Sequence, residues 1–207
     1  MPVRRGYQLW APSYLRGGDN PLSRLAADLV EALVPRRSTG LLLDLGCGTG
    51  RHLPFLEAEG AQALGIDLSA RMLDRAAARG RVLAADLRHL PLADATASGA
   101  LASLCLSHVP DPLPALREWA RVLEPGGWVV VVDLHPATKA LGWRRSFRGP
   151  AGEALAIQWH AHDLDALCHA AQGTGLEVQL LRSAGLRAEQ LGPDAPPSAL
   201  QAEALYG

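Results

Sequence analysis

The segment that decides the fold reads Leu41-Leu42-Leu43-Asp44-Leu45-Gly46-Cys47-Gly48-Thr49-Gly50-Arg51. It starts as an apolar run of strand length, breaks into a glycine-rich loop, and is followed by a segment of helical period. Glycine lacks a Cβ atom and readily takes a positive φ, so the backbone of such a loop can come close to a ligand at the carboxyl end of a strand. The segment therefore predicts a first strand that opens into a ligand-binding crevice, with Asp44 facing the ligand.

On both sides of this segment, short apolar runs alternate with stretches of helical period, a pattern typical of a parallel sheet covered by helices. Strands are expected at Leu41–Leu45, Ala63–Ile66, Val82–Ala85, Ala100–Leu106, Val129–Leu134 and Leu176–Leu181. Helices are expected over Pro21–Val34, from near Arg51, after Ser69 and Asp111 as N-caps, and from near Asp163. The predicted fold class is α/β, with a doubly wound and mostly parallel sheet.

Composition and charge exclude several kinds of protein. The chain of 207 residues is long enough for one α/β domain, and its formal net charge of −1 gives no reason to expect a nucleic-acid partner. Cys47, Cys105 and Cys168 lie far apart without a Cys-x-x-Cys pair, which favours reduced thiols in a cytoplasmic protein and predicts no metal site. The first 20 residues hold no apolar run, so neither a signal peptide nor a membrane span is expected.

The spacing of the glycines distinguishes between nucleotide cofactors. A dinucleotide fingerprint needs Gly-x-Gly-x-x-Gly, whereas this loop reads Gly-x-Gly-x-Gly, which argues against NAD. The stretch from Asp44 to Gly50 instead resembles the first motif of the class I S-adenosylmethionine-dependent methyltransferases, which have a Rossmann-like sheet. The resemblance implies that Asp44 supports the loop and the methionyl ammonium. It also implies that the methionyl and ribose parts of S-adenosylmethionine are wrapped by Gly46, Cys47, Gly48, Thr49 and Gly50.

The second and third strands both end in acidic residues. Asp67, in Gly65-Ile66-Asp67-Leu68-Ser69, would accept hydrogen bonds from the ribose hydroxyls, a geometry that nicotinamide dinucleotides share. The segment Ala85-Asp86-Leu87 resembles the methyltransferase segment whose Asp accepts from the adenine amino group. The other cofactor residues implied by the resemblance are Tyr14, Leu68, Met72, Leu87 and Leu106, with a core role for Met72 and Leu87 left open.

The segment from Ser103 to Asp111 follows the fourth strand. In methyltransferases, the residues at this position usually determine which acceptor is methylated. The segment lacks the Asn/Asp-Pro-Pro-Tyr/Phe motif of amine-methylating relatives and resembles the branch typified by quinone-biosynthesis C-methyltransferases, methyltransferase type 11. An aromatic N-terminal segment, Tyr7 to Leu15, supports the same branch and implies that Tyr7 and Tyr14 fold over the cofactor. The expected enzyme transfers a methyl group from S-adenosylmethionine to a small molecule, at carbon or oxygen.

Methyl transfer from a sulfonium is an in-line displacement, so alignment and exclusion of water matter most. A base is needed only where the nucleophile must lose a proton. His108 and His135 are the candidate catalytic residues, because each follows a strand end at the crevice; a structural or exposed role for each stays open. His160 and His162 are interpreted as acceptor-pocket or capping residues, since two ligands are too few for a metal.

The whole chain, residues 1–207, is expected to form a single methyltransferase domain. Its parts are an N-terminal cap segment and helix (1–35), the cofactor-binding core (36–135), a candidate acceptor lid (136–162) and a loose tail (192–207). The lid is basic and aromatic, through Lys139, Trp143, Arg144, Arg145, Phe147 and Arg148. It favours an aromatic or carboxylate-bearing acceptor, unless it is a solvated loop.

The sequence allows two arrangements at the C-terminal edge of the sheet. No strand is evident between Pro193 and Gly207, so either Gly185 to Leu191 supplies a short seventh strand or the sheet is incomplete. A homodimer is left open. A non-catalytic S-adenosylmethionine-binding partner or sensor remains the alternative function, while the glycine spacing and Asp86 disfavour a nicotinamide-dependent oxidoreductase.

Overall fold

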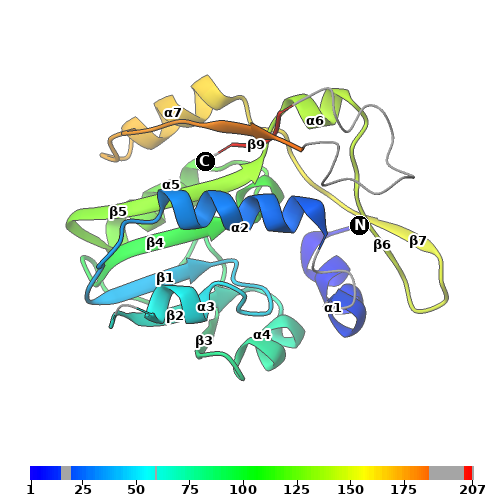
Figure 1. Ribbon diagram of the computed structural model, residues 1–207, viewed down its shortest axis with the longest axis horizontal. Helices are drawn as coiled ribbons and strands as arrows, with labels where there is room; N and C mark the ends of the chain where they lie inside the picture. The colour runs from blue at the N-terminus through cyan, green and yellow to red at the C-terminus, as the bar shows by residue number, and fades with distance from the viewer. Residues whose placement is uncertain (15–19, 59, 187–202, 207) are drawn as a thin grey trace.

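The computed structural model describes residues 1–14, 20–58, 60–186 and 203–206. Its centre is a seven-stranded sheet in the order β3-β2-β1-β4-β5-β9-β8, and Figure 1 shows helices on both faces of it. The strands are β1 (Leu41–Leu45), β2 (Gln62–Asp67), β3 (Arg81–Ala84), β4 (Ala97–Ser103), β5 (Leu123–Leu134), β8 (Ser183–Gly185) and β9 (Glu203–Tyr206). The order reverses between β1 and β4, where open α/β sheets bind their ligands.

The first five strands are parallel, whereas β9 runs antiparallel to both β5 and β8. The helices are α1 (Val3–Tyr14), α2 (Pro21–Leu33), α3 (Leu53–Glu57), α4 (Ala70–Ala76), α5 (Leu113–Val122), α6 (Ala137–Ala140) and α7 (Leu164–Gln172), with a 3-10 turn at Leu106–His108. The predicted doubly wound, mostly parallel α/β sheet is confirmed.

The two faces of the sheet alternate along β1, as the two-residue period of a strand requires. Leu42 packs with the α2 residues Leu25 and Val30, whereas Leu43 lies in the cluster that contains Leu116 and Trp119 of α5. Because both faces are covered, the strands are continuous apolar runs rather than alternating ones. This sandwich fixes the carboxyl ends of β1, β2 and β4 beside one another.

Two predicted helix starts hold and several other boundaries shift. Asn20 caps α2 by accepting a hydrogen bond from the Ser23 backbone N–H at 2.9 Å, and Asp163 caps α7 in the same way. β5 starts at Leu123 rather than at Val129, and the N-cap of α5 is Pro112 rather than Asp111. The predicted strand Ala100–Leu106 is wrong at both ends, because β4 starts at Ala97 and ends at Ser103. Leu104 takes a φ of 56°, which turns the chain out of the sheet and into the 3-10 turn that carries His108.

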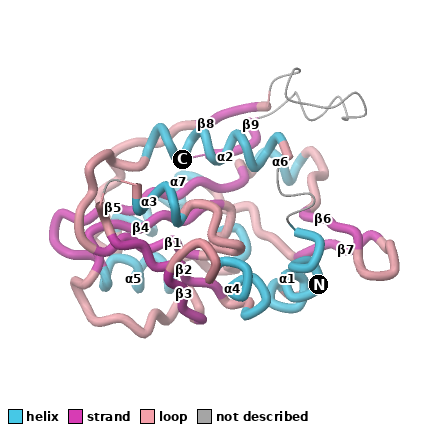
Figure 2. Tube along the Cα trace, turned by 60° about the horizontal axis from the view of Figure 1, so that its bottom comes forward, coloured by secondary structure: helices cyan, strands magenta, loops and turns pink. Residues whose placement is uncertain are grey.

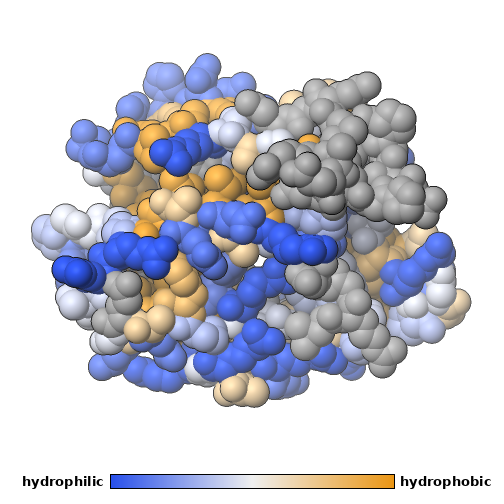
Figure 3. Space-filling model, viewed as in Figure 1, coloured by the Kyte–Doolittle hydropathy of each residue, from blue (hydrophilic) through white to orange (hydrophobic). Residues whose placement is uncertain are grey.

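The C-terminal edge of the sheet differs from the prediction. Leu176–Leu181 forms no strand: Leu180 and Leu181 are exposed, and Figure 3 shows apolar side chains on this face between α2 and α7. Strand β8 is limited to Ser183–Gly185, because only these residues of that segment pair with β9. The expectation of no strand between Pro193 and Gly207 is wrong, because β9 pairs with β5 and ends in a buried Tyr206. Of the two alternatives for this edge, an incomplete sheet is therefore excluded. The rest of the predicted seventh strand beyond Leu186 lies outside the described residues.

The predicted lid segment is a structured hairpin that packs on α1. The hairpin consists of β6 (Arg145–Arg148) and β7 (Ala154–Ile157), paired antiparallel, and Figure 2 shows it beside α1. The ring of Phe147 stacks on Trp10 with centroids 5.0 Å apart, and Gly6 leaves room for Ile157 because a Cβ there would lie 2.7 Å from that side chain. The first helix and the hairpin therefore form one continuous wall.

Candidate functional site

A cavity of about 400 Å³ lies at the carboxyl ends of β1, β2 and β4, within the range of small-molecule sites. The glycine loop, α1 and the β6–β7 hairpin enclose it. The predicted cofactor and catalytic residues that line it are Tyr14, Asp44, Gly46, Cys47, Gly48, Thr49, Asp67, Leu68, Asp86, Leu87 and His108. The sequence pattern therefore located most of one wall of the site.

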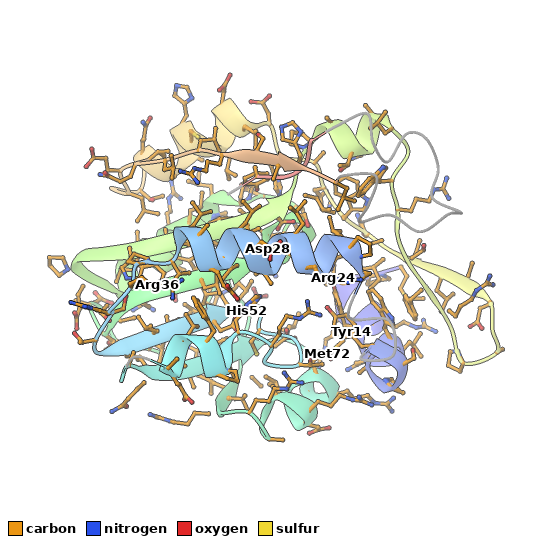
Figure 4. All side chains as sticks on the ribbon, in the orientation of Figure 1. Tyr14, Arg24, Asp28, Arg36, His52 and Met72 are labelled. Carbon is orange, nitrogen blue, oxygen red and sulfur yellow. The ribbon has the colours of Figure 1, made fainter. Side chains whose placement is uncertain are left out.

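Four predicted residues do not line this cavity. Gly50 has a φ of 74° and packs tightly against Leu53 and Ala76, so it shapes the loop from behind. Met72 and Leu106 are fully buried in the core; Figure 4 labels Met72 on α4. His135 lies at the start of α6, where its Nδ1 accepts the Ala137 backbone N–H at 3.2 Å, and it is not among the lining residues.

The other two histidines are also placed away from the cavity. The Nε2 atom of His162 lies 3.2 Å from the Leu106 carbonyl, and the His160 backbone N–H donates to the Ser107 carbonyl. Both therefore tie the segment before α7 to the turn after β4. Their interpretation as acceptor-pocket residues is not supported by the lining of the cavity.

The glycines of the loop differ in what surrounds them. Gly46 has a φ of 68°, and a Cβ on it would lie 2.5 Å from the Cβ of Cys105. Gly48 has a φ of 55° and nothing within 4 Å of a Cβ position, so its open side faces the cavity. Gly46 thus allows close packing against Cys105, in the segment that follows β4, while Gly48 keeps the cavity wall free of a side chain.

Asp67 fastens this loop to the end of β2. Its Oδ2 accepts the backbone N–H of Gly48 at 2.9 Å, and its Oδ1 accepts that of Ser69 at 2.8 Å. Burial raises the pKa of Asp67, and the backbone donors oppose this rise. Ser69 occupies the predicted N-cap position of α4, but its hydroxyl makes no capping bond. Each carboxylate oxygen of Asp67 retains capacity for a further donor.

Asp44 presents a buried carboxylate to the cavity. The residue is 1% exposed, and its Oδ2 has no hydrogen-bond partner. Burial and the nearby Asp67 raise the pKa of Asp44 to about 7. A buried carboxylate without a partner is costly, and a cation in the cavity would complete it. The site therefore fits a ligand that carries an ammonium group next to the glycine loop.

Asp86 is more exposed and is already engaged. Arg88 holds it through two side-chain hydrogen bonds of 2.9 and 2.6 Å, and this pairing lowers the pKa of Asp86. Leu87 follows it and lines the cavity. The amino group of a nucleobase at this position would share Asp86 with Arg88. The sequence pattern did not reveal that Arg88 pairs with Asp86.

The opposite wall carries a chain of polar contacts. The Tyr7 hydroxyl lies 2.8 Å from Nε2 of His108 and accepts a hydrogen bond from Arg145 at 2.9 Å. Nδ1 of His108 lies 3.0 Å from the carbonyl oxygen of Gln158. Burial, followed by the charge of Arg145, lowers the pKa of His108 to about 3. The wall thus combines a neutral imidazole, a phenol and a cation.

Sequence reasoning missed several lining residues, among them Ser103, Cys105 and Gln158. Burial raises the pKa of the Cys47 and Cys105 thiols, so neither is an activated nucleophile. Among the residues that the structure describes, no group of three or more His, Cys, Asp or Glu is placed to hold a metal ion. In the same ranges, no helix is long and apolar enough to span a membrane.

Comparisons with known proteins agree with this geometry. Residues 43–131 match the family model described as a methyltransferase domain. A malonyl-[acyl-carrier protein] O-methyltransferase from Dechloromonas aromatica is 37% identical over 141 residues, covering 66% of this chain and 52% of the relative. The chain spans about half the length of the first curated relatives it matches.

Solved structures show the same fold. An S-adenosylmethionine-dependent methyltransferase from Mesorhizobium loti superposes with a TM-score of 0.69 at 22% identity, covering 91% of this chain and 96% of that one. Phosphoethanolamine N-methyltransferase 2 from Haemonchus contortus, in complex with phosphomonomethylethanolamine and S-adenosylhomocysteine, gives 0.67 at 18% identity over 88% of this chain and 47% of that one. Residues 43–131 therefore match a methyltransferase domain, and S-adenosylmethionine, the cofactor expected from the sequence, is named for solved structures that share the fold. The predicted resemblance to S-adenosylmethionine-dependent methyltransferases is confirmed.

Proposed function

We propose that the protein transfers the methyl group of S-adenosylmethionine to a small-molecule acceptor, at carbon or oxygen, by in-line displacement at the sulfonium carbon. The observation that carries the proposal is the division of one cavity into two chemically different walls. Asp44, whose Oδ2 is buried without a hydrogen-bond partner, lies on the glycine-loop wall. A cation, Arg145, lies on the wall formed by α1 and the hairpin.

In this proposal the glycine-loop wall binds the cofactor. Asp44 neutralises the methionyl ammonium, which explains why a buried carboxylate is tolerated without a partner. Asp67 lies at the end of β2 and accepts from the ribose hydroxyls with its remaining lone pairs. Asp86 accepts from the adenine amino group while Leu68 and Leu87 flank the ring.

The wall of α1 and the hairpin excludes water and aligns the acceptor. Tyr7, Trp10 and Tyr14 are spaced three and four residues apart, so they share one face of α1, and their rings contact one another. α1 is also tied to α4, because Arg71 donates to the Gln8 carbonyl and Arg75 to the Pro12 carbonyl. A sulfonium loses its positive charge on transfer, so a dry site of low polarity favours the reaction.

The relatives favour oxygen over carbon as the methylated atom. Several are named as malonyl-[acyl-carrier protein] O-methyltransferases, which supports O-methylation here. Since the chain spans about half their length, their acceptor is not transferred to it.

A turnover assay tests the proposal. The protein is incubated with S-adenosylmethionine and a panel of phenols, quinols, carboxylic acids and acyl thioesters, and both S-adenosylhomocysteine and the methylated product are measured by mass spectrometry. Stoichiometric formation of the two products supports the proposal. Cofactor binding without methyl transfer to any acceptor would favour the non-catalytic partner or sensor instead.

A further inference from the structure

Arg145 carries a positive charge that no acidic side chain in the described ranges contacts within ion-pair distance. One Nη atom donates to Tyr7, while Nε is buried with no hydrogen-bond partner. Asp133 is near enough to act on Arg145 through its charge, but its two oxygens accept the backbone N–H groups of Ser107 and Leu134. Arg145 lines the cavity and therefore offers a cation and an open donor to a ligand.

Hydrogen bonds link Arg145, Tyr7, His108 and Gln158 in a row. Their donor-to-acceptor direction follows from the atoms at the Gln158 end. The carbonyl oxygen of Gln158 can only accept, so Nδ1 of His108 carries the proton. The imidazole is neutral, which leaves Nε2 as an acceptor for the Tyr7 hydroxyl. The hydrogen bonds therefore run from Arg145 to Tyr7, from Tyr7 to His108 and from His108 to Gln158.

This direction leaves no base on the wall. The lone pair of His108 is occupied by the Tyr7 proton, and burial raises the pKa of Tyr7, so the phenol keeps that proton. An acceptor that must lose a proton, such as a phenol or an alcohol, finds no free group on this wall to take it. His52 also lines the cavity, but it follows the glycine loop, and burial lowers its pKa to about 4. Arg145 also repels an acceptor that carries an ammonium group. An acceptor that is already an anion meets both conditions.

We infer that the acceptor presents a carboxylate, that Arg145 binds one of its oxygens and that the other oxygen receives the methyl group; this rests on the proposed function. The planar guanidinium matches a carboxylate better than an ammonium side chain does. A carboxylate is ionised at neutral pH, since its reference pKa is about 4. The new O–CH₃ bond forms as the CH₃–S bond breaks, which yields a neutral methyl ester and the neutral thioether S-adenosylhomocysteine.

Tyr7 acts as a positioning residue in this arrangement. Its hydroxyl holds one Nη atom of Arg145, and its ring stacks on Trp10 at 5.9 Å. Trp10 in turn stacks on Phe147, two residues along the hairpin from Arg145. The guanidinium of Arg145 is therefore held directly by Tyr7, and Tyr7 is held through Trp10 by Phe147 of the same strand. This limits the side-chain entropy that Arg145 loses when a carboxylate binds.

The test compares matched probes. Phenylacetate and the malonyl thioester of N-acetylcysteamine present a carboxylate; phenylacetamide and 4-methylphenol present the same ring without a negative charge. Methyl ester formation from S-adenosylmethionine is measured by mass spectrometry, and binding of each probe to the complex with S-adenosylhomocysteine is measured by calorimetry. The expected result is methylation and binding of the carboxylates alone.

Three variants locate the effect. Arg145→Gln is expected to lower kcat/KM for the carboxylate by about 10- to 100-fold, as for loss of a charged hydrogen bond, with unchanged cofactor affinity. Arg144→Gln removes an exposed arginine from the same hairpin segment and is expected to change neither quantity. Arg145→Lys keeps the charge without the planar fork and should fall between them, which controls for folding.

Three results would overturn the inference: preferred methylation of 4-methylphenol, equal binding of phenylacetate and phenylacetamide to the S-adenosylhomocysteine complex, or unchanged carboxylate turnover in Arg145→Gln. Absence of S-adenosylmethionine binding to the unmodified protein is a different result. It would contradict the proposed function itself and remove the basis of the inference.

Discussion

The hydroxyl of Tyr7 on α1 lies 2.8 Å from Nε2 of His108 beyond the end of β4, a contact between residues 101 positions apart. It determines what His108 can do. A histidine at a strand end in a crevice suggests a catalytic base, but this imidazole already accepts one proton and donates the other. In the proposed arrangement, His108 orients Tyr7 and, through it, Arg145.

The pH dependence of methyl transfer should reflect this role. Burial and the charge of Arg145 lower the pKa of His108 to about 3, with Tyr7 and His160 as its other titratable neighbours. With a carboxylate acceptor at saturating cofactor, kcat should therefore stay level between about pH 6 and about pH 8. A rate that rises with a single ionisation near the ordinary histidine pKa of about 6.5, and that still does so in Asp44→Asn but not in His108→Ala, would show instead that His108 works as a base.

Asp44→Asn should separate stability from cofactor binding. Burial raises the pKa of Asp44 to about 7, above its value in the unfolded chain, so the stability linked to its protonation is lost as pH rises through that value. Above it, the unliganded variant should be more stable by on the order of 1–3 kcal/mol in thermal unfolding. Affinity for S-adenosylmethionine should fall about 10- to 100-fold, because the ammonium loses its counter-charge. Weaker binding without added stability would contradict this account.

Replacing two glycines of the loop by alanine should have different effects. In Gly46→Ala the new Cβ would meet Cys105 at 2.5 Å, so unfolding free energy should fall by about 2 kcal/mol or more. In Gly48→Ala the Cβ meets no protein atom within 4 Å, and the cost is that of a positive φ, about 1 kcal/mol. Gly48→Ala should nevertheless weaken cofactor binding, since its Cβ projects toward the ligand. Denaturant titration and calorimetry measure the two effects, and equal destabilisation would argue against the assignment.

Tyr7→Phe tests the positioning of Arg145. The variant keeps the ring that stacks on Trp10 but removes the hydroxyl that accepts from Arg145. KM for the carboxylate should rise about tenfold while kcat changes by less than about threefold, because the loss affects binding rather than the reacting atoms. A fall in kcat at unchanged KM would place Tyr7 among the reacting groups.

Most of the residues that the sequence assigns to the cofactor line one cavity, because their signals are local. Asp44, Asp67 and Asp86 each end an apolar run, and the carboxyl ends of neighbouring parallel strands meet at one edge of a sheet. The glycine spacing added the class of cofactor. Leu106 and Met72, for which a core role was left open, are instead buried in the core, because the side of an element that a residue faces depends on rotation that a motif does not specify.

The wall formed by α1 and the hairpin could be predicted from the sequence only as a basic and aromatic segment. Arg145 was included with other basic lid residues, but nothing local distinguishes it from Arg144, which is exposed. Only the contact of the hairpin with α1 makes that distinction. For the same reason β9 was missed: it has four residues, and its pairing with β5 depends on partners about seventy positions away.

The central claim is tested most directly by calorimetric titration with S-adenosylmethionine and, separately, with NADH. The unmodified protein is compared with Asp67→Ala and with Asp74→Ala, which removes an exposed carboxylate on α4. The account predicts binding of S-adenosylmethionine alone, lost in Asp67→Ala and kept in Asp74→Ala, with all three proteins folded by circular dichroism. Binding of NADH instead, or an affinity for S-adenosylmethionine that Asp67→Ala leaves unchanged, would contradict it.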